Sequence, residues 1–457
     1  MSHTEISSNL DALTRGWGER CAVSLFLERC QVNTPERLVS SVWQHLVSYR
    51  QRVGKVIDFG AGDGRFARYG AYDTYVGYEI DASRCSPVAE NATVLNACAF
   101  SSNVYDADLC IGNPPFVRNQ DLPSGWQTSA AKLLKTRTGV QLSGLANAWQ
   151  YFFLLGLASV KTDGLCALVV PYEWVSRPSA RVLRDYIRNN GWNVDVYRLV
   201  DETFRSVMTT ASITVVDKSV QEGRWRYFEE TAQGRYKPLA SASGSAAGVL
   251  QYAIGKASKW AKPFVRRGTS PGTQKVLVLT EGQRVSNGLQ IRHDVVPCVT
   301  SLKPLPAGLL ELDEAAFDKY YRCQGEKCWL IRTDKDLSPR LAAYLDAVPA
   351  EAYQTKTCLA RQVWWRFKFP EVPDVLVAQT FKRRFPKAVR NSTGARAVGG
   401  VSGVYRATDE QAADLIAGFG EMDISDRVVS YAKGLRKIEI NQLNWVLRDR
   451  FGSGSGP

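Results

Sequence analysis

Short apolar runs alternate with helical patterns through the first half of the chain. The runs are short enough for buried strands, and the segments between them have the apolar spacing of helices. The first predicted strand begins at residue 55, and the others span 74–81, 106–112 and 165–171. One predicted helix begins at the glycines that follow the first strand, and two more span 144–160 and 178–191. This alternation predicts an α/β fold with an open parallel sheet and helices on both faces. Ligands bind such sheets at the carboxyl ends of the strands.

The pattern changes near the middle of the chain. Residues 238–248 are small and polar and contain glycine, which is typical of a linker. A length of 457 residues also exceeds that of one ordinary core. We therefore predict a first domain over 1–240, a second domain of mixed α/β or α+β structure over 249–452, and a flexible tail at 453–457.

The net charge of +13 is concentrated in the second half. Residues 1–248 contain 26 lysines and arginines against 24 acidic residues, whereas residues 249–457 contain 32 against 21. A nearly neutral half followed by a basic half suggests chemistry in the first and binding of a polyanion in the second. A solvated basic surface would give the same composition.

Cysteine and histidine usage argues against disulfides and metal sites. The ten cysteines are scattered, often inside apolar runs, which fits reduced thiols in a cytoplasmic protein. Cys323 and Cys328 lack a second pair at zinc spacing, and only three histidines exist, so we predict no metal. The start lacks the layout of a signal peptide, and charge and glycine interrupt the most apolar stretch, 151–171, so we predict no membrane span.

A glycine loop and an acidic residue predict a nucleotide-type pocket. Gly60, Gly62 and Gly64 follow the first predicted strand, where glycine permits a tight turn and a close approach of backbone to ligand. The spacing is not that of a dinucleotide fingerprint, and a Walker lysine is absent. Glu79 ends the second predicted strand, about twenty residues past the first glycine, where a carboxylate can accept from two ribose hydroxyls. Together these features favour an adenosine-type ligand.

The most specific motif is Asn113-Pro114-Pro115-Phe116, at the end of a predicted strand. An exocyclic aromatic amine is a poor nucleophile because its lone pair is delocalised into the ring. The Asn113 side-chain oxygen and the Pro114 carbonyl can accept from both N–H groups of such an amine, and proline fixes the backbone that holds that carbonyl. Phe116 can stack on the base, which contributes about 1–3 kcal/mol. The motif therefore predicts methylation of a base amino group.

In this order the motifs resemble those of the γ class of adenine-N6 DNA methyltransferases, found in bacterial restriction–modification systems. The resemblance covers most of residues 20–217 and extends more loosely through the C-terminal half. It implies a Rossmann-like methyltransferase sheet domain followed by a DNA target-recognition domain. It also implies methyl transfer from S-adenosylmethionine to N6 of a flipped-out adenine in duplex DNA, with S-adenosylhomocysteine as product and no metal.

The resemblance assigns roles to residues around the cofactor. Residues 33–35 match the family's N-terminal cofactor motif, and Cys98 stands where the family has an aspartate that contacts the adenine of the cofactor. The cofactor-binding residues implied in this way are Thr34, Pro35, Asp58, Gly60, Ala61, Gly62, Glu79, Ile80, Cys98, Phe100 and Asn113.

The resemblance also implies how the target base is held. Phe204, within the late motif at 201–216, would sandwich the flipped base opposite Asn113, Pro114, Pro115 and Phe116. A core phenylalanine before a buried strand is the alternative interpretation of Phe204.

In the basic second domain, cations interleave with aromatic residues over 361–369 and 380–396, and we expect DNA contacts from Arg361, Arg366, Lys382, Arg383 and Arg384.

Two other functions remain compatible with the sequence. Motifs of the Asn-Pro-Pro-aromatic type also occur in methyltransferases that act on RNA bases or on glutamine side chains, and a catalytically silent DNA-binding subunit could keep the fold. The resemblance favours duplex DNA as the partner, with the chain acting as a monomer on it. It also implies a cytoplasmic location, associated with the nucleoid through DNA, and a companion restriction endonuclease.

Overall fold

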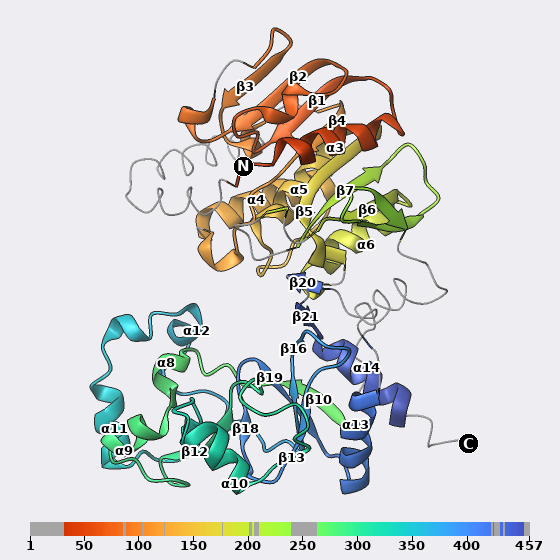
Figure 1. Cartoon of the computed structure of the whole chain (residues 1–457). Coiled ribbons are helices and arrows are strands. Elements are labelled where there is room, and N and C mark those ends of the chain that lie inside the picture. Colours follow the sequence, from red (N-terminus) through yellow and green to blue (C-terminus); the bar gives the residue numbers. More distant parts are fainter. Residues whose placement is uncertain are drawn as a thin grey trace. The chain divides into compact units, whose positions relative to one another are not determined.

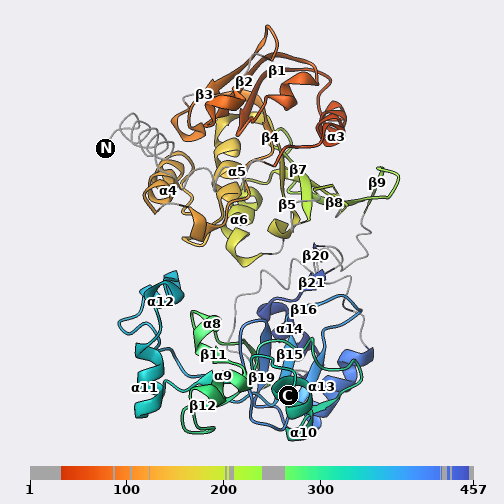
Figure 2. The same cartoon turned by 60° about the vertical axis from the view of Figure 1, so that its left-hand side comes forward.

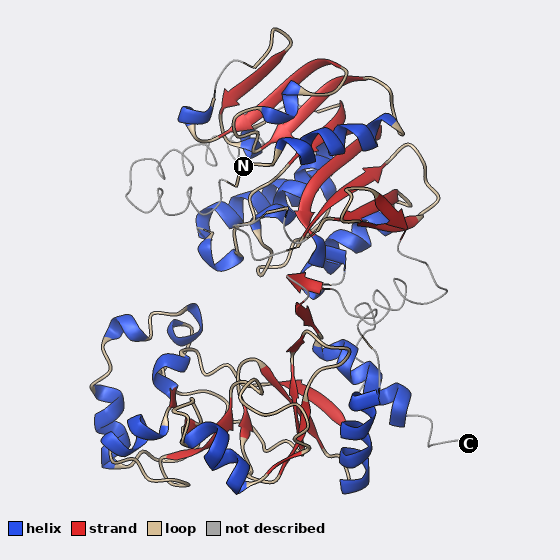
Figure 3. Ribbon diagram, in the orientation of Figure 1, coloured by secondary structure: helices blue, strands red, loops and turns tan. Residues whose placement is uncertain are grey.

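The computed structural model describes residues 32–85, 88–102, 105–122, 124–175, 177–200, 203–204, 210–238, 263–421, 424, 430–432 and 435–451 (Figures 1 and 3). Contacts within the chain define two compact units. The first unit comprises residues 1–250 and 431–433, and the second comprises 251–430 and 434–457. The division at Leu250 and Gln251 lies close to the predicted linker, most of which falls outside the described residues.

A sheet of nine described strands forms the centre of the first unit, in the order β3-β2-β1-β4-β5-β7-β6-β8-β9. Its strands are β1 (Val53–Phe59), β2 (Tyr72–Glu79), β3 (Ala92–Asn96), β4 (Ala107–Gly112), β5 (Val160–Pro171), β6 (Asn193–Arg198), β7 (Ala211–Asp217), β8 (Trp225–Glu230) and β9 (Tyr236–Pro238). Strands β1 to β5 pair in parallel, so their carboxyl ends share one edge. The α/β architecture expected from the sequence is confirmed.

The four strands predicted from the sequence, β1, β2, β4 and β5, pair in parallel as expected, and later strands make the complete sheet mixed. Strand β7 lies antiparallel between β5 and β6, and β9 lies antiparallel to β8. Strand β7 follows β6 in the chain and pairs with it in the antiparallel direction, which a short connection allows. The pattern of apolar residues along a strand indicates that the strand is buried, but it does not indicate whether the strand runs parallel or antiparallel to its neighbours.

Helices cover the two faces of this sheet (Figures 1 and 2). The α-helices among the described residues of the first unit are α3 (Glu36–Val47), α4 (Ser124–Thr138), α5 (Ala148–Ser159) and α6 (Arg181–Asn189). Helix α3 buries Leu38, Val39 and Val42 in a cluster with alternate residues of the central strands, such as Leu109 and Ile111 of β4. The intervening residue Cys110 points to the opposite face, where Gly156 of α5 approaches it closely.

The glycine loop is followed by a short 3-10 helix, η1 (Arg65–Arg68), instead of the helix that the sequence predicted. The reason is local. Tyr69 is extended, Gly70 has a left-handed φ of +85°, and β2 begins at Tyr72, so a longer helix has no room. The other 3-10 helices of this unit are η2 (Ala82–Arg84), η3 (Ala99–Ser101), η4 (Asn119–Asp121), η5 (Tyr172–Val175) and η6 (Pro178–Ala180).

The second unit combines small sheets with short helices. One sheet has the order β10-β19-β15-β17-β13 and another β11-β14-β12-β18. The described strands are β10 (Phe264–Arg267), β11 (Val278–Leu279), β12 (Val295–Val299), β13 (Glu311–Leu312), β14 (Trp329–Ile331), β15 (Val375–Ala378), β16 (Thr380–Phe381), β17 (Ala388–Asn391), β18 (Arg396–Ala397), β19 (Val401–Tyr405) and β21 (Leu435–Lys437). Most of β20 (Ser430–Ala432) falls in residues 431–433, which belong to the first unit. This arrangement agrees with the mixed class predicted for the second domain.

The helices of the second unit are α8 (Gln274–Leu277), α9 (Glu281–Ser286), α10 (Glu314–Phe317), η7 (Asp318–Arg322), α11 (Pro339–Asp346), η8 (Ala350–Ala352), α12 (Lys356–Leu359), α13 (Asp409–Glu421) and α14 (Ile440–Phe451). Asn444 of α14 accepts from the Val265 amide at 2.7 Å and donates to its carbonyl at 3.0 Å, which fastens this helix to β10. Within the described ranges, no helix is both long enough and apolar enough to cross a bilayer.

Candidate active site

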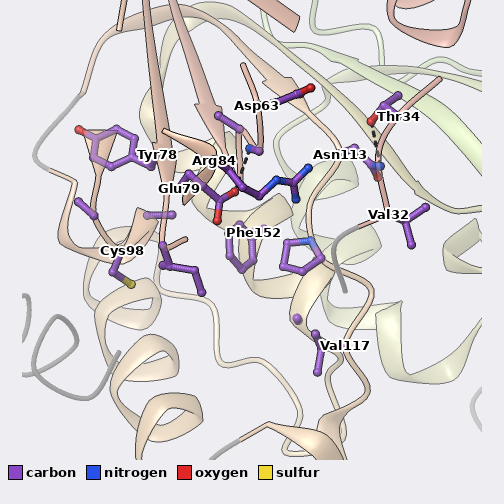
Figure 4. A pocket seen from close by; sticks show the side chains of 18 of the residues that line it. Val32, Thr34, Asp63, Tyr78, Glu79, Arg84, Cys98, Asn113, Val117 and Phe152 are labelled. Atoms are coloured by element: carbon purple, nitrogen blue, oxygen red, sulfur yellow. Dashed lines mark hydrogen bonds between the residues drawn. The ribbon is translucent and has the colours of Figure 1, made fainter. Parts of the chain in front are cut away.

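A pocket lies at the carboxyl ends of the parallel strands, where the glycine loop, the end of β2 and the segment after β4 meet. Figure 4 shows Thr34 and Asn113 at one end of it and Cys98 at the other, with Glu79 and Phe152 between them. Ten residues of the sequence predictions line this pocket: Thr34, Gly60, Ala61, Gly62, Glu79, Ile80, Cys98, Phe100, Asn113 and Pro115. One cavity therefore joins the predicted nucleotide motifs to the predicted catalytic motif.

The glycine loop holds the carboxylate of Glu79 in place. Gly60 and Gly62 have left-handed φ values of +89° and +57°, which glycine adopts without steric cost. The Gly62 amide donates to Glu79 Oε2 at 2.9 Å, and the Asp81 amide donates to Oε1 at 3.0 Å. Each carboxylate oxygen keeps a further lone pair, so the 8% exposed Glu79 can still accept from two hydroxyls of a ligand.

Asp58 lies beneath the loop and is fully buried, outside the lining of the pocket. Its Oδ2 accepts from the Tyr75 hydroxyl at 2.6 Å, and among the described residues its Oδ1 has no hydrogen-bond partner. Burial raises the pKa of Asp58 to about 7, which the Tyr75 hydrogen bond partly opposes and the charge of Glu79 reinforces. Asp58 therefore sits within the site region as a buried carboxyl that is costly to ionise.

Asn113 follows β4 directly and reaches the pocket from its end. Gly112 before it has φ +150°, and a Cβ there would come within 2.3 Å of Asp58 Oδ1, so the turn requires glycine. The Asn113 side-chain nitrogen donates to Thr34 Oγ1 at 3.1 Å. With its nitrogen engaged, the amide presents its oxygen as the end that can accept from a substrate amine.

The rest of the tetrapeptide divides between pocket and core. Pro115 lines the pocket, whereas Pro114 is buried behind it. Phe116 is partly buried and packs on the core cluster that contains Phe204, which is 7% exposed. The structure thus brings the two aromatic residues predicted to hold a base to one cluster, and their stacking on a base stays a prediction.

An aromatic wall closes the pocket near Cys98. Phe100, which is fully buried, makes edge-to-face contacts with Trp126 of α4 at 5.1 Å and with Phe152 of α5 at 5.2 Å between ring centroids. Cys98 precedes η3 and is 5% exposed. This apolar end suits a planar ring, and the polar groups farther along the pocket, Glu79 in the middle and Asn113 at the other end, suit the groups attached to that ring.

Sequence reasoning missed several lining residues. Trp126 belongs to α4, a helix that the sequence analysis did not predict, and Phe152 belongs to α5, whose apolar residues indicated only a buried helix. No spacing connects either residue to the motifs. Arg65 and Arg84 also line the pocket, and Arg84 lies against Gly62 and donates to the Asn33 side chain. The only signal in the sequence for these arginines was their closeness to the glycine loop and to Glu79. Conversely, Pro35, Asp58, Pro114, Phe116 and Phe204 do not line the pocket.

The five cations predicted to contact DNA differ in their surroundings. Arg361 is partly buried, and its guanidinium donates to the carbonyls of Pro271 at 2.6 Å, Trp364 at 3.2 Å and Ser270 at 3.4 Å. Arg366, Lys382, Arg383 and Arg384 are exposed on the second unit. In the described part of the chain, no three His, Cys, Asp or Glu side chains come together as a metal site.

Comparisons with known proteins agree with the motifs. Residues 88–203 match the family model described as Eco57I restriction-modification methylase. The chain is 23% identical, over 461 aligned residues, to the type II methyltransferase M.XamI of Xanthomonas campestris pv. amaranthicola, covering 90% of this chain and 83% of that protein. A shorter match to the type II methyltransferase M.AccI of Acinetobacter calcoaceticus is 25% identical and covers 24% of this chain and 20% of that protein.

A solved structure extends the likeness to the fold. The type IIL restriction-modification enzyme MmeI, solved in complex with DNA, aligns with 94% of this chain and 66% of its own at a TM-score of 0.55 and 12% identity. The chain thus spans about two thirds of that enzyme. The methyltransferase fold and the similarity to methyltransferases of restriction–modification systems, both expected from the motifs, are confirmed.

Proposed function

We propose that this chain is a site-specific DNA methyltransferase of a restriction–modification system, and that it methylates N6 of adenine in duplex DNA with S-adenosylmethionine as donor. The observation that carries the proposal is the single pocket that holds Glu79 and the glycine loop together with Asn113 and Pro115. The similarity over 83% of a type II methyltransferase supports the class of enzyme. The choice of adenine N6 rests on the tetrapeptide.

The residues of the pocket fit S-adenosylmethionine. Glu79 would accept from its ribose hydroxyls, the wall of Phe100, Trp126 and Phe152 would pack around its adenine, and Thr34 would border its methionine part. The fit also rests on Gly62, whose left-handed φ of +57° turns its amide toward the Glu79 carboxylate. When bound, this cofactor supplies an electrophilic methyl group on a sulfonium.

Asn113 and Pro114 would prepare the acceptor. Two carbonyl-type oxygens that accept from both N–H groups of an exocyclic amine favour a lone pair localised on nitrogen. Their placement on a proline-stiffened turn after β4 fixes that geometry before the substrate arrives. Phe116 and Phe204 would hold the extruded ring, offsetting part of the few kcal/mol that base flipping costs.

The most direct test is to sequence modified bases after the chain is expressed in a bacterium that lacks DNA methylation. We expect N6-methyladenine at one fixed position of a short recognition sequence. Purified protein should incorporate labelled methyl groups into duplex DNA far faster than into RNA or into protein. Preferential labelling of RNA or of glutamine would replace the proposal with one of those substrates. Cofactor binding without labelling of any of them would identify a silent DNA-binding subunit.

A further inference from the structure

A continuous set of polar contacts runs from the glycine loop to the catalytic amide. Asp63 grips Arg65 through two bonds, from Nε to Oδ1 at 2.8 Å and from Nη2 to Oδ2 at 2.6 Å. The remaining terminal nitrogen of Arg65 donates to the Thr34 carbonyl at 2.5 Å. The Thr34 hydroxyl then accepts from Asn113 at 3.1 Å (Figure 4). We name these four residues the Asp63–Asn113 chain.

In the Asp63–Asn113 chain, the contact between Asp63 and Arg65 is a strong ion pair, and Thr34 is shielded from solvent. The Asp63–Arg65 pair is bidentate, and the side chains are 32% and 17% exposed, respectively. The hydrogen bond between them lowers the pKa of Asp63 and raises that of Arg65, so both stay charged across the neutral range. Thr34 is 4% exposed, and Pro35 restricts the backbone that follows it.

We propose that Thr34, held by Arg65, is a positioning residue that orients the amide of Asn113 for catalysis, beyond the cofactor contact that the motif implies for it. The inference rests on the proposed function, because it assigns a role to Asn113 in methyl transfer. Arg65 fixes the backbone of Thr34, and the Thr34 hydroxyl fixes the nitrogen of the amide. The amide oxygen is thereby kept in the orientation that accepts from a purine amino group.

The physical reason for a hydroxyl at this place is the symmetry of the amide. A carboxamide can rotate by half a turn and exchange its oxygen for its NH2 group with little change in shape. An NH2 group facing a substrate amine would oppose one donor with another. Valine has the shape of threonine without the acceptor, so it would leave the amide free to rotate. Serine would keep the acceptor.

The experiment compares Thr34→Val, Thr34→Ser and Arg65→Lys with the wild-type protein in steady-state methylation of duplex DNA. Binding of S-adenosylhomocysteine, measured by calorimetry, provides a readout that is independent of activity. Thr34→Val should lower kcat by about 10–100-fold, since misplacement of a catalytic group by about an ångström costs this much. The loss of kcat should exceed any loss of cofactor affinity, and Thr34→Ser should recover most of kcat. Arg65→Lys should fall between them, because one ammonium nitrogen cannot reproduce the paired bonds to Asp63 and the bond to the Thr34 carbonyl, which use three nitrogens of Arg65.

A double-mutant cycle makes the test specific. In an Asn113→Ala background, Thr34→Val should have no further effect on the residual rate, because the group it positions is gone. Thr74→Val, at an exposed threonine of β2, is the matched control and should behave as wild type. An unchanged kcat with weakened cofactor binding in both Thr34 variants, or full additivity in the cycle, would overturn the inference while the proposed function stands. An inactive wild-type protein that binds cofactor would overturn both.

Discussion

The two units use their charged and polar side chains in different ways. In the first unit, polar groups converge on one pocket, and each is held by another, as Glu79 is by two backbone amides and Asn113 is by Thr34. In the second unit, basic residues are spread over the surface, and some that look available in the sequence are bound to the protein itself, as Arg361 is. A catalytic motif therefore predicts which residues act, whereas a basic composition predicts only that a surface is positively charged.

The largest expected effect comes from removing the predicted catalytic amide in the pocket of the first unit. Asn113→Ala removes the amide that would accept from the substrate amine, and we expect methylation to fall by at least about 10²–10³-fold. Calorimetry with S-adenosylhomocysteine should show nearly normal binding, because the amide acts on the acceptor. Asn189→Ala, at an exposed position of α6, serves as control. A variant at Asn113 with full activity would show that the tetrapeptide is not the catalytic motif.

Asp58 tests how far the buried part of the first unit tolerates charge. Its folded-state pKa of about 7 exceeds the unfolded value of about 4. The stability that the neutral carboxyl contributes is therefore complete below pH 4 and is lost as the pH rises through 7. Asp58→Asn stays neutral, so it should gain on the order of a few kcal/mol relative to wild type between pH 5 and pH 8.

Urea unfolding of both proteins at several pH values measures this difference. Asp195→Asn is an informative contrast, since Asp195 is also buried but is paired with Arg226 in two short hydrogen bonds. That variant should lose stability at neutral pH. Parallel stability curves for wild type and Asp58→Asn would mean that Asp58 titrates in the folded chain as it does in water.

A substitution of Glu79 tests the ribose contact proposed for the middle of the pocket. Glu79→Gln keeps one acceptor but replaces the other oxygen with a donor that faces an amide N–H or a ribose hydroxyl. We expect the Kd for S-adenosylhomocysteine to rise by about tenfold or more, since a hydrogen bond to a charged group contributes about 1.5–3 kcal/mol. Glu90→Gln, at an exposed glutamate of the same unit, should leave the Kd unchanged. Equal binding by the two variants would remove the ribose role.

The smallest effects are expected from exposed basic residues of the second unit, which are compared with the internally bonded Arg361. Lys382→Ala combined with Arg383→Ala should weaken DNA binding by about threefold to tenfold. The dependence of binding on salt should also flatten, with the slope falling by about 0.9 for each phosphate that the variant no longer neutralises. The melting temperature should not change, because both side chains are exposed.

Arg361→Lys is the complementary variant. The single nitrogen of lysine cannot take the places of both terminal nitrogens that Arg361 uses to reach these carbonyls, so this change should lower the melting temperature more than it lowers DNA affinity. Fluorescence anisotropy at several salt concentrations, together with thermal unfolding, measures both properties. The opposite outcome, in which DNA binding disappears and stability is kept, would support the DNA contact that the sequence predicts for Arg361.

Local patterns in the sequence predicted much of the fold and the central residues of the site. The strands β1, β2, β4 and β5, the helices α5 and α6, the glycine loop, Glu79 and Asn113 could be predicted because each depends on neighbours in sequence. The wall of Trp126 and Phe152 could not, since helical apolar residues look alike whether they pack on a core or line a pocket. The antiparallel direction of β7 and the shortness of η1 also lay beyond pattern reading.

The sequence alone determined which chemical groups this protein can bring to a ligand, because motif order along parallel strands places those groups at one edge of a sheet. Only the tertiary structure decided which groups are engaged. Thr34 and Asn113 are 79 residues apart and meet because the segment before α3 and the end of β4 reach the same pocket. Hydrogen bonds between distant residues depend on the packing of whole elements, and no local pattern encodes that distance.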